Sequence, residues 1–279
     1  MDKFRRIFSK RTSIIGMIHL NPLPGTPFYQ SGSFNQIIEK ARHETNVYIE
    51  NNIDAILIEN MHDIPYVKSD KFGPEIVSSM TAAAIEVKNL CDSKIPIGIQ
   101  VLAGGGKEAL SISKSVGLNF IRNEGYVFAH VGDEGMIESN AGELLRYRKM
   151  IDAENVMIFN DIKKKHSSHA ITSDLSLLDT AHATKFFQSD GIILTGKSTG
   201  DATDLNDVKI IANEKEKLKM PLLIGSGVTK SNLRDYFGIA DALILGSYFK
   251  TDGYWSNDLC STRINDFMRD ACEFEKSLK

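Results

Sequence analysis

Eight short, continuous apolar runs recur along the chain, and stretches with helical spacing separate them. Strands that are buried on both faces produce such runs, whereas half-exposed strands alternate apolar and polar residues. The runs cover residues 14–20, 55–59, 97–102, 120–122, 156–161, 191–195, 222–225 and 242–246. Strict alternation of strands and helices implies a parallel sheet with right-handed crossovers.

The segments between the runs carry apolar residues at i, i+3 and i+4 spacing, most clearly in residues 34–49. Further helices are predicted over residues 76–90, 107–116, 144–151, 174–187, 204–217, 230–237 and 258–275. Ser33, Asp204 and Thr229 have the residue types that begin helices.

Eight strand–helix units of about 35 residues each use the whole length of 279 residues, and no linker interrupts them. We therefore predict a single (β/α)8 barrel, or TIM barrel, over residues 13–279, in preference to an open doubly wound sheet. Residues 1–12 are predicted to form a short basic leader. Because ligands of such barrels bind at the carboxyl ends of the strands, the site is expected there.

Charge and composition limit the partners of the chain. With 33 Lys and Arg against 36 Asp and Glu, the net charge is −3, which excludes a broad electrostatic footprint for nucleic acid. No apolar run approaches the length of a membrane span, and the three cysteines indicate a reducing compartment. We predict a cytoplasmic protein. The leader, with Phe4, Ile7 and Phe8 among basic residues, is expected to be solvated; the alternatives are an organellar (for example mitochondrial) signal or a membrane-surface helix.

Glycine and serine follow the seventh and eighth runs. The N–H groups of Gly225, Ser226, Gly227, Gly246 and Ser247 are predicted to converge on a phosphate, assisted by a helix N-terminus near Thr229. The alternative is a pair of tight turns. Further candidate binding residues at the strand ends are Lys250, Arg122, Thr195, Gly196, His19 and Asn60. His19 has an alternative interpretation as a structural histidine.

Residues 160–166 follow the fifth run and carry the strongest candidates for acid/base chemistry. Strand alternation points Asp161 and Lys163 the same way, so we predict Asp161 as a base and Lys163 as an electrostatic stabiliser or Schiff-base donor. Glu59 is predicted as a second acid/base or hydroxyl ligand, with a buried salt bridge to Arg122 or Lys163 as the alternative. His166 is a further catalytic candidate. No cofactor is predicted, although a divalent metal on His166 and His169 is an alternative.

Residues 104–107 read Gly-Gly-Gly-Lys, which superficially suggests a nucleotide loop. A P-loop needs Ser or Thr after the lysine, and Glu108 occupies that position. A flexible turn before a helix is predicted instead.

The chain resembles the BtpA/SgcQ family over roughly residues 13 to 270. The motifs that carry the resemblance follow the family's order: IHLNPLPG (18–25), EN with DIP (59–65), FIR (120–122), DEG (133–135), DIKKKH (161–166), LTG with TG (194–200), GSGV (225–228) and GSYFK with G (246–253). Bacterial members carry an Asn-Asp pair where this chain has residues 104–106, so a role of that loop does not transfer.

The resemblance implies a TIM barrel related to phosphate-binding barrels. One family member is associated with photosystem I accumulation and another is a putative nucleosidase, so the family leaves the reaction open. We expect an enzyme, an isomerase, lyase or glycosyl hydrolase, acting on a phosphorylated sugar or nucleoside-like substrate. The alternative is a non-catalytic factor that assembles or stabilises a protein complex. A homo-oligomer is expected on general grounds.

Overall fold

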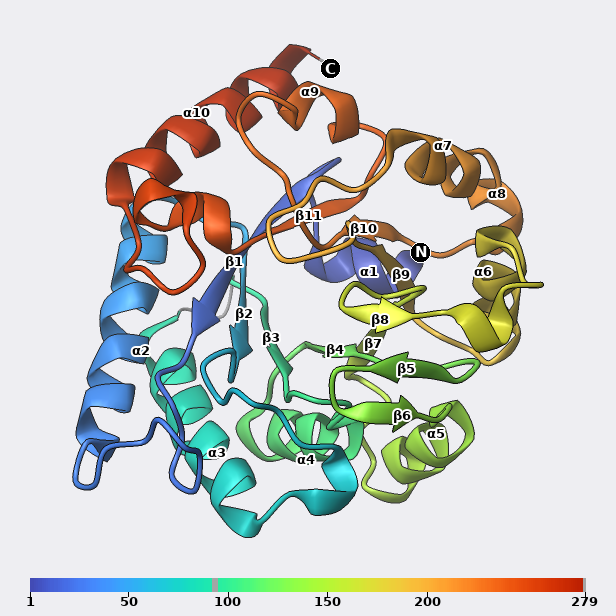
Figure 1. Ribbon diagram of the computed structural model, residues 1–279. Helices are drawn as coiled ribbons and strands as arrows, with labels where there is room; N and C mark the ends of the chain where they lie inside the picture. Colours follow the sequence, from blue (N-terminus) through green and yellow to red (C-terminus); the bar gives the residue numbers. More distant parts are fainter. Residues whose placement is uncertain (92–94, 278–279) are drawn as a thin grey trace.

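The computed structural model describes residues 1–91 and 95–277, so residues 92–94 and 278–279 of the predicted domain lie outside the described residues. Eight parallel strands close into a barrel in the order β1-β11-β10-β9-β7-β4-β3-β2, and helices surround it (Figure 1). The predicted TIM barrel is therefore confirmed. The barrel strands are β1 (Ser13–His19), β2 (Ala55–Glu59), β3 (Ile97–Gln100), β4 (Phe120–Asn123), β7 (Met157–Asp161), β9 (Gly191–Leu194), β10 (Leu222–Ile224) and β11 (Ala242–Leu245).

Every residue of these eight strands is buried, because helices cover the outer face of the barrel and side chains fill its interior. This is why the strands appear in the sequence as continuous apolar runs. The surrounding helices are α2 (Phe34–Glu50), α3 (Pro74–Leu90), α4 (Gly106–Val116), α5 (Ala141–Met150), α6 (Leu177–Phe186), α7 (Leu205–Asn213), α8 (Lys215–Leu218), α9 (Leu233–Tyr236) and α10 (Ser261–Ser277).

The helix starts follow the predicted caps in part. Asp204 precedes α7 and its side chain accepts a hydrogen bond from the amide of Asn206. Ser33 precedes α2 without a side-chain cap bond. The predicted start near Thr229 is wrong: the Thr229 amide donates to Asn232 Oδ1, and the four-residue α9 begins only at Leu233.

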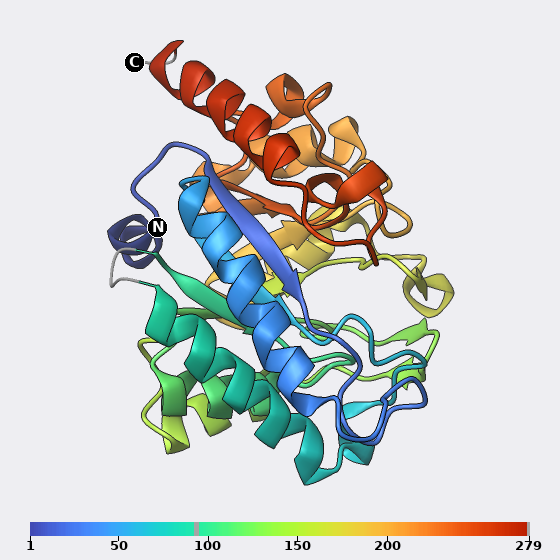
Figure 2. The ribbon, with the colours of Figure 1, turned by 90° about the vertical axis from the view of Figure 1, so that its left-hand side faces the viewer.

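The basic leader is not the solvated segment that the sequence suggested. It forms helix α1 (Asp2–Ile7), which lies at one end of the barrel (Figure 2). Phe4 and Phe8 are each 1% exposed and belong to the apolar cluster inside the barrel. The rings of Phe8 and Phe120 lie 5.7 Å apart, and those of Phe4 and Phe159 lie 5.9 Å apart.

The basic residues of this leader are also bound to the barrel. Lys3 Nζ donates to the Glu154 carbonyl oxygen at 2.6 Å, and Arg5 pairs with the buried Asp241. Residues 1–8 are too few for a helical pattern of apolar residues to be recognised in the sequence. The two phenylalanines of this segment face the barrel rather than a membrane. No helix within the described residues is long and apolar enough to cross a membrane.

A small antiparallel sheet, which the sequence did not predict, stands at the opposite end of the barrel. Its strands, in the order β6-β5-β8, are β5 (His130–Gly132), β6 (Gly135–Ile137) and β8 (Ser167–Ser168). It joins the loop after β4 to the loop after β7, so it brings residues 124–137 beside residues 163–169 (Figure 1). The loops of the described residues also contain short 3-10 helices: η1 (Ser69–Lys71), η2 (Ala170–Thr172), η3 (Ser247–Phe249) and η4 (Thr251–Gly253).

Candidate active site

One inward-facing position at the carboxyl end of each strand builds the floor of the site. Side chains alternate along a strand, so the positions two residues beyond the inward apolar layer also face inward. These positions are His19, Glu59, Gln100, Arg122, Asp161, Thr195, Gly225 and Gly246. Five of these eight positions carry a large polar or charged side chain, and the two on the neighbouring strands β10 and β11 are glycines that directly follow the strand.

A cavity of about 800 Å³ opens above this layer. A Cβ atom on Gly225 would lie 3.2 Å from Arg122 Nη2, and one on Gly246 would lie 3.1 Å from His19 Cε1. The two glycines therefore keep space open beside the charged residues. The predicted site residues that line the cavity are His19, Glu59, Arg122, His166, Gly225, Ser226, Gly227, Gly246 and Ser247.

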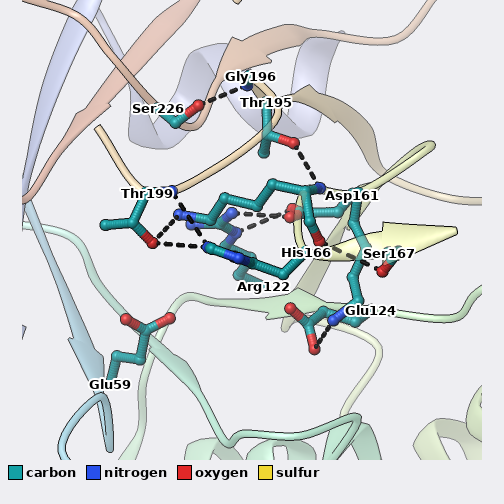
Figure 3. A network of polar contacts seen from close by, with 12 residues as sticks. Glu59, Arg122, Glu124, Asp161, His166, Ser167, Thr195, Gly196, Thr199 and Ser226 are labelled. Atoms are coloured by element: carbon teal, nitrogen blue, oxygen red, sulfur yellow. Dashed lines mark hydrogen bonds and ion pairs between the residues drawn. The ribbon is translucent and has the colours of Figure 1, made fainter. Parts of the chain in front are cut away.

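Arg122 and Asp161 form a buried, bidentate ion pair (Figure 3). Arg122 Nε and Nη2 donate to the two carboxylate oxygens of Asp161 at 2.8 and 2.7 Å. Although burial opposes it, the Asp161 carboxylate raises the pKa of Arg122. Asp161 does not line the cavity, so it lies behind Arg122 rather than facing a ligand. The pair fixes the guanidinium at the cavity wall.

The three consecutive lysines after β7 point in different directions. Lys163 has a φ of 45° and its Nζ donates to the Leu175 carbonyl oxygen at 2.6 Å, away from the cavity. Strand alternation ends there, which is why the prediction that Asp161 and Lys163 face the same way is wrong. Lys164 lies 3.4 Å from Glu124, whose carboxylate raises the lysine pKa against the effect of burial.

Lys165 takes the place in the cavity that the sequence assigned to Lys163. Its backbone N–H donates to Thr195 Oγ1 at 3.0 Å, and its Nζ lies 3.3 Å from Thr199 Oγ1. Among the described residues no carboxylate lies within ion-pair distance of this ammonium. Burial and the nearby Arg122 lower the pKa of Lys165, which makes it a candidate proton carrier or amine nucleophile.

Glu59 is a buried carboxyl, and no basic side chain among the described residues is in hydrogen-bond contact with it. Burial raises its pKa to about 7, although Arg122 opposes this. The predicted salt bridges to Arg122 and Lys163 do not form. The imidazole of His19 lies beside it, with Nε2 3.6 Å from Glu59 Oε2. Figure 3 shows Glu59 without a bond to the other side chains drawn.

His19 is held in one tautomer. Its Nδ1 lies 3.2 Å from the Trp255 carbonyl oxygen, and a carbonyl only accepts, so Nδ1 carries the proton. Burial, with Lys250 nearby, lowers the pKa of His19, so the ring is neutral. Nε2 then presents a lone pair to Glu59, which favours the protonated carboxyl.

The two Gly-Ser turns after β10 and β11 line the cavity beside each other, because these strands are neighbours in the barrel. Gly227 has a φ of 67°, and a Cβ there would lie 2.1 Å from the Asp201 carbonyl oxygen, so only glycine fits. Among the described residues, the amides of Ser226, Gly227 and Ser247 have no hydrogen-bond acceptor. They are available to a ligand anion, without the helix N-terminus that was predicted to assist.

Four predicted binding residues lie outside the cavity lining. Lys250 is buried and its Nζ lies 2.6 Å from Glu44 Oε1, so it joins the outer layer rather than a phosphate. Asn60 bonds the backbone of Leu102 and the side chain of Asp63. Thr195 accepts from Lys165, and the Gly196 amide donates to Ser226 Oγ at 2.6 Å.

His166 ties the loop after β9 to the loop after β7 (Figure 3). Its Nε2 lies 3.1 Å from the Thr199 amide and 3.0 Å from Thr199 Oγ1. His169 instead lies 3.1 Å from the Lys164 carbonyl oxygen. Across residues 1–91 and 95–277, no group of three or more His, Cys, Asp or Glu side chains is placed to hold a metal ion.

Sequence reasoning did not select several polar residues that line the cavity, among them Lys165, Gln100 and Arg263. Gln100 could have been predicted, because it is the last residue of β3 and the other candidate residues were selected for the same position at a strand end. Arg263 comes from α10, where its Nε donates to the Tyr248 carbonyl oxygen at 2.7 Å and its guanidinium stacks on the Tyr248 ring. Nothing in a helical stretch marks such a residue.

The sequence profile of the BtpA family matches residues 10–273. The chain belongs to the BtpA family. An uncharacterised mitochondrial protein of Caenorhabditis elegans is 46% identical over 94% of this chain and 93% of its own length. The photosystem I biogenesis protein BtpA of Synechocystis is 33% identical over 99% of this chain and 93% of its own length.

Solved structures share the barrel. A thiamine phosphate pyrophosphorylase from Pyrococcus furiosus aligns with a TM-score of 0.56 at 12% identity, covering 95% of this chain and 98% of its own. An orotidine 5'-monophosphate decarboxylase from Methanocaldococcus jannaschii aligns with a TM-score of 0.54 at 12% identity, covering 93% and 98%. At such identities the likeness establishes the fold of this family member.

Proposed function

We propose that the protein is an enzyme that acts on a phosphorylated small molecule, a sugar or nucleoside-like compound, by acid/base chemistry in the cavity at the carboxyl end of the barrel. The observation that carries the proposal is the presence of Glu59 and Lys165 in the same cavity. A carboxyl whose pKa is raised to about 7 and an ammonium whose pKa is lowered line one cavity. Glu59 then exchanges protons near neutral pH, as an acid/base catalyst must, and the lowered pKa of Lys165 makes its proton easier to release.

The turns at Ser226-Gly227 and Gly246-Ser247 support a phosphate on the other side of the cavity. They offer amides that lack acceptors among the described residues, at the loops where phosphate binds in many such barrels. The names of two solved barrels of the same fold include a phosphorylated compound. Arg263 adds a positive charge to this side of the cavity, in place of the predicted Lys250.

Each residue has one role in this proposal. Glu59 delivers or removes the proton. The lone pair of His19 Nε2 faces the Glu59 carboxyl and stabilises its protonated form. Lys165 stabilises negative charge that develops on the substrate, or as the free amine condenses with a substrate carbonyl to a Schiff base, with the carbonyl oxygen leaving as water. Asp161 is a positioning residue for Arg122 rather than the base. Isomerisation, elimination and glycosyl cleavage all use such a proton donor beside a cation.

Two lysines of the same loop provide a matched test. A thermal-shift screen of sugar phosphates and nucleotides first identifies a substrate, and turnover is then measured for Lys165→Met, Glu59→Gln and Lys163→Met. Loss of turnover in the first two variants, with nearly wild-type turnover in Lys163→Met, supports the proposal. Equal loss in both lysine variants, or full activity of Glu59→Gln, contradicts it.

We also propose a homo-oligomer in the cytoplasm, and both parts remain predictions. Size-exclusion chromatography with light scattering decides the first. The mitochondrial name of the Caenorhabditis elegans relative supports the organellar alternative for the second, and imaging of the full chain with a fluorescent tag at its C-terminus distinguishes the two.

A further inference from the structure

Gln100 is a buried amide whose oxygen has no partner among the described residues. It is the last residue of β3, is 2% exposed and lines the cavity. Within residues 1–91 and 95–277, no group donates a hydrogen bond to its Oε1 atom. A buried polar atom without a partner is destabilising, and a bound ligand that donates to it would remove that cost.

The position of Gln100 in the barrel relates it to both proposed parts of the site. Gln100 pairs in register with Glu59, so the amide and the carboxyl lie side by side on neighbouring strands. In the closed strand order, β3 stands four strands away from β10 in either direction, which is directly across the barrel. A ligand whose phosphate rests on Ser226 and Gly227 would extend across the cavity to reach Gln100.

The wall beside Gln100 is apolar. Met61, Ile64, Tyr66 and Leu102 line the cavity there, in the loops that follow β2 and β3. The Tyr66 hydroxyl donates to the Met61 carbonyl oxygen at 2.6 Å, so its ring is what remains to contact a ligand. A sugar hydroxyl would satisfy the amide of Gln100 but leave these four side chains against a polar group.

We infer that Gln100 and this apolar wall recognise a planar nitrogen heterocycle, such as a nucleobase, on the ligand whose phosphate lies at the opposite turns. A carboxamide accepts and donates at once, so it pairs with an edge that carries an N–H beside an acceptor, while apolar side chains cover the faces of the ring. The cavity of about 800 Å³ exceeds what a phosphate or a pentose phosphate fills. This inference rests on the proposed function and narrows it from phosphorylated compounds to nucleotide-like ones.

Isothermal titration of the full chain tests it with inorganic phosphate, ribose 5-phosphate and the four common ribonucleoside 5'-monophosphates. We expect at least one nucleotide to bind about tenfold more tightly than ribose 5-phosphate. Gln100→Leu, which keeps the volume and removes the unpaired amide, should abolish that difference and leave the affinity for ribose 5-phosphate unchanged. Gln100→Glu should change which nucleotide is preferred, because it replaces the donor with a second oxygen.

The outcomes separate this inference from the proposed function. Binding of ribose 5-phosphate with no gain from any base overturns the heterocycle and leaves the phosphate site standing. An equal loss of ribose 5-phosphate and nucleotide in Gln100→Leu shows a structural role only, and also overturns it. No binding by any of the probes contradicts the proposed function itself. If Gln100→Leu does not fold, the wild-type comparison and Gln100→Glu decide.

Discussion

Replacing Glu59 with glutamine tests the electrostatics of the site independently of any substrate. Burial raises the Glu59 pKa from 4.5 to about 7. The folded state therefore holds a proton that the unfolded chain has released, and stability contributed by this group is present below pH 4.5 and lost as the pH rises through about 7. At about 1.36 kcal/mol per pKa unit, the loss is about 3 kcal/mol.

Glu59→Gln removes this dependence while keeping the shape of the side chain. We expect the difference in free energy of unfolding, variant minus wild type, to increase by about 3 kcal/mol between pH 4 and pH 8. Urea denaturation at each pH measures it. Glu143→Gln is the control, since Glu143 is 76% exposed and its difference should stay nearly constant. A difference that does not change with pH for Glu59→Gln would refute the reasoning.

Three further substitutions test other parts of the structure. Asp161→Asn should destabilise the fold by about 3 kcal/mol or more by leaving Arg122 buried without its partner, and unchanged urea stability would contradict the bidentate pair. Phe8→Ala should cost about 3–5 kcal/mol if α1 closes the barrel, whereas a solvated leader predicts almost no effect on the melting temperature. Lys250→Met should lower thermal stability, because Glu44 would lose its partner, but it should leave phosphate affinity intact. A loss of phosphate affinity without a loss of stability would show that Lys250 binds the ligand.

The barrel could be predicted because each buried strand leaves a local signal in the sequence. A strand buried on both faces must be apolar along its length, and eight such runs separated by helices leave few topologies. Glu59 and Arg122 could likewise be predicted as site residues, because each lies at the carboxyl end of an apolar run. Both inferences rest on strand geometry, and both hold only as far as that geometry extends.

Beyond the strand ends, the sequence no longer determines where a side chain points. The left-handed backbone at Lys163 turns that lysine out and leaves Lys165 in the cavity. The partner of a charge is also set by tertiary structure: Lys250 meets Glu44 of α2, more than two hundred positions away. For the same reason the burial of Phe4 and Phe8 was not visible in residues 1–12.

The claim that a phosphorylated ligand binds in this cavity is tested most directly by titrating ribose 5-phosphate into the wild type, Ser247→Glu and Thr251→Glu. Ser247 lines the cavity at the turn after β11, whereas Thr251 is exposed and does not line it. Placing a negative charge at Ser247 should weaken binding at least about tenfold, and the same charge at Thr251 should change it little. Equal affinity of all three proteins, or no binding to the wild type, would contradict the account.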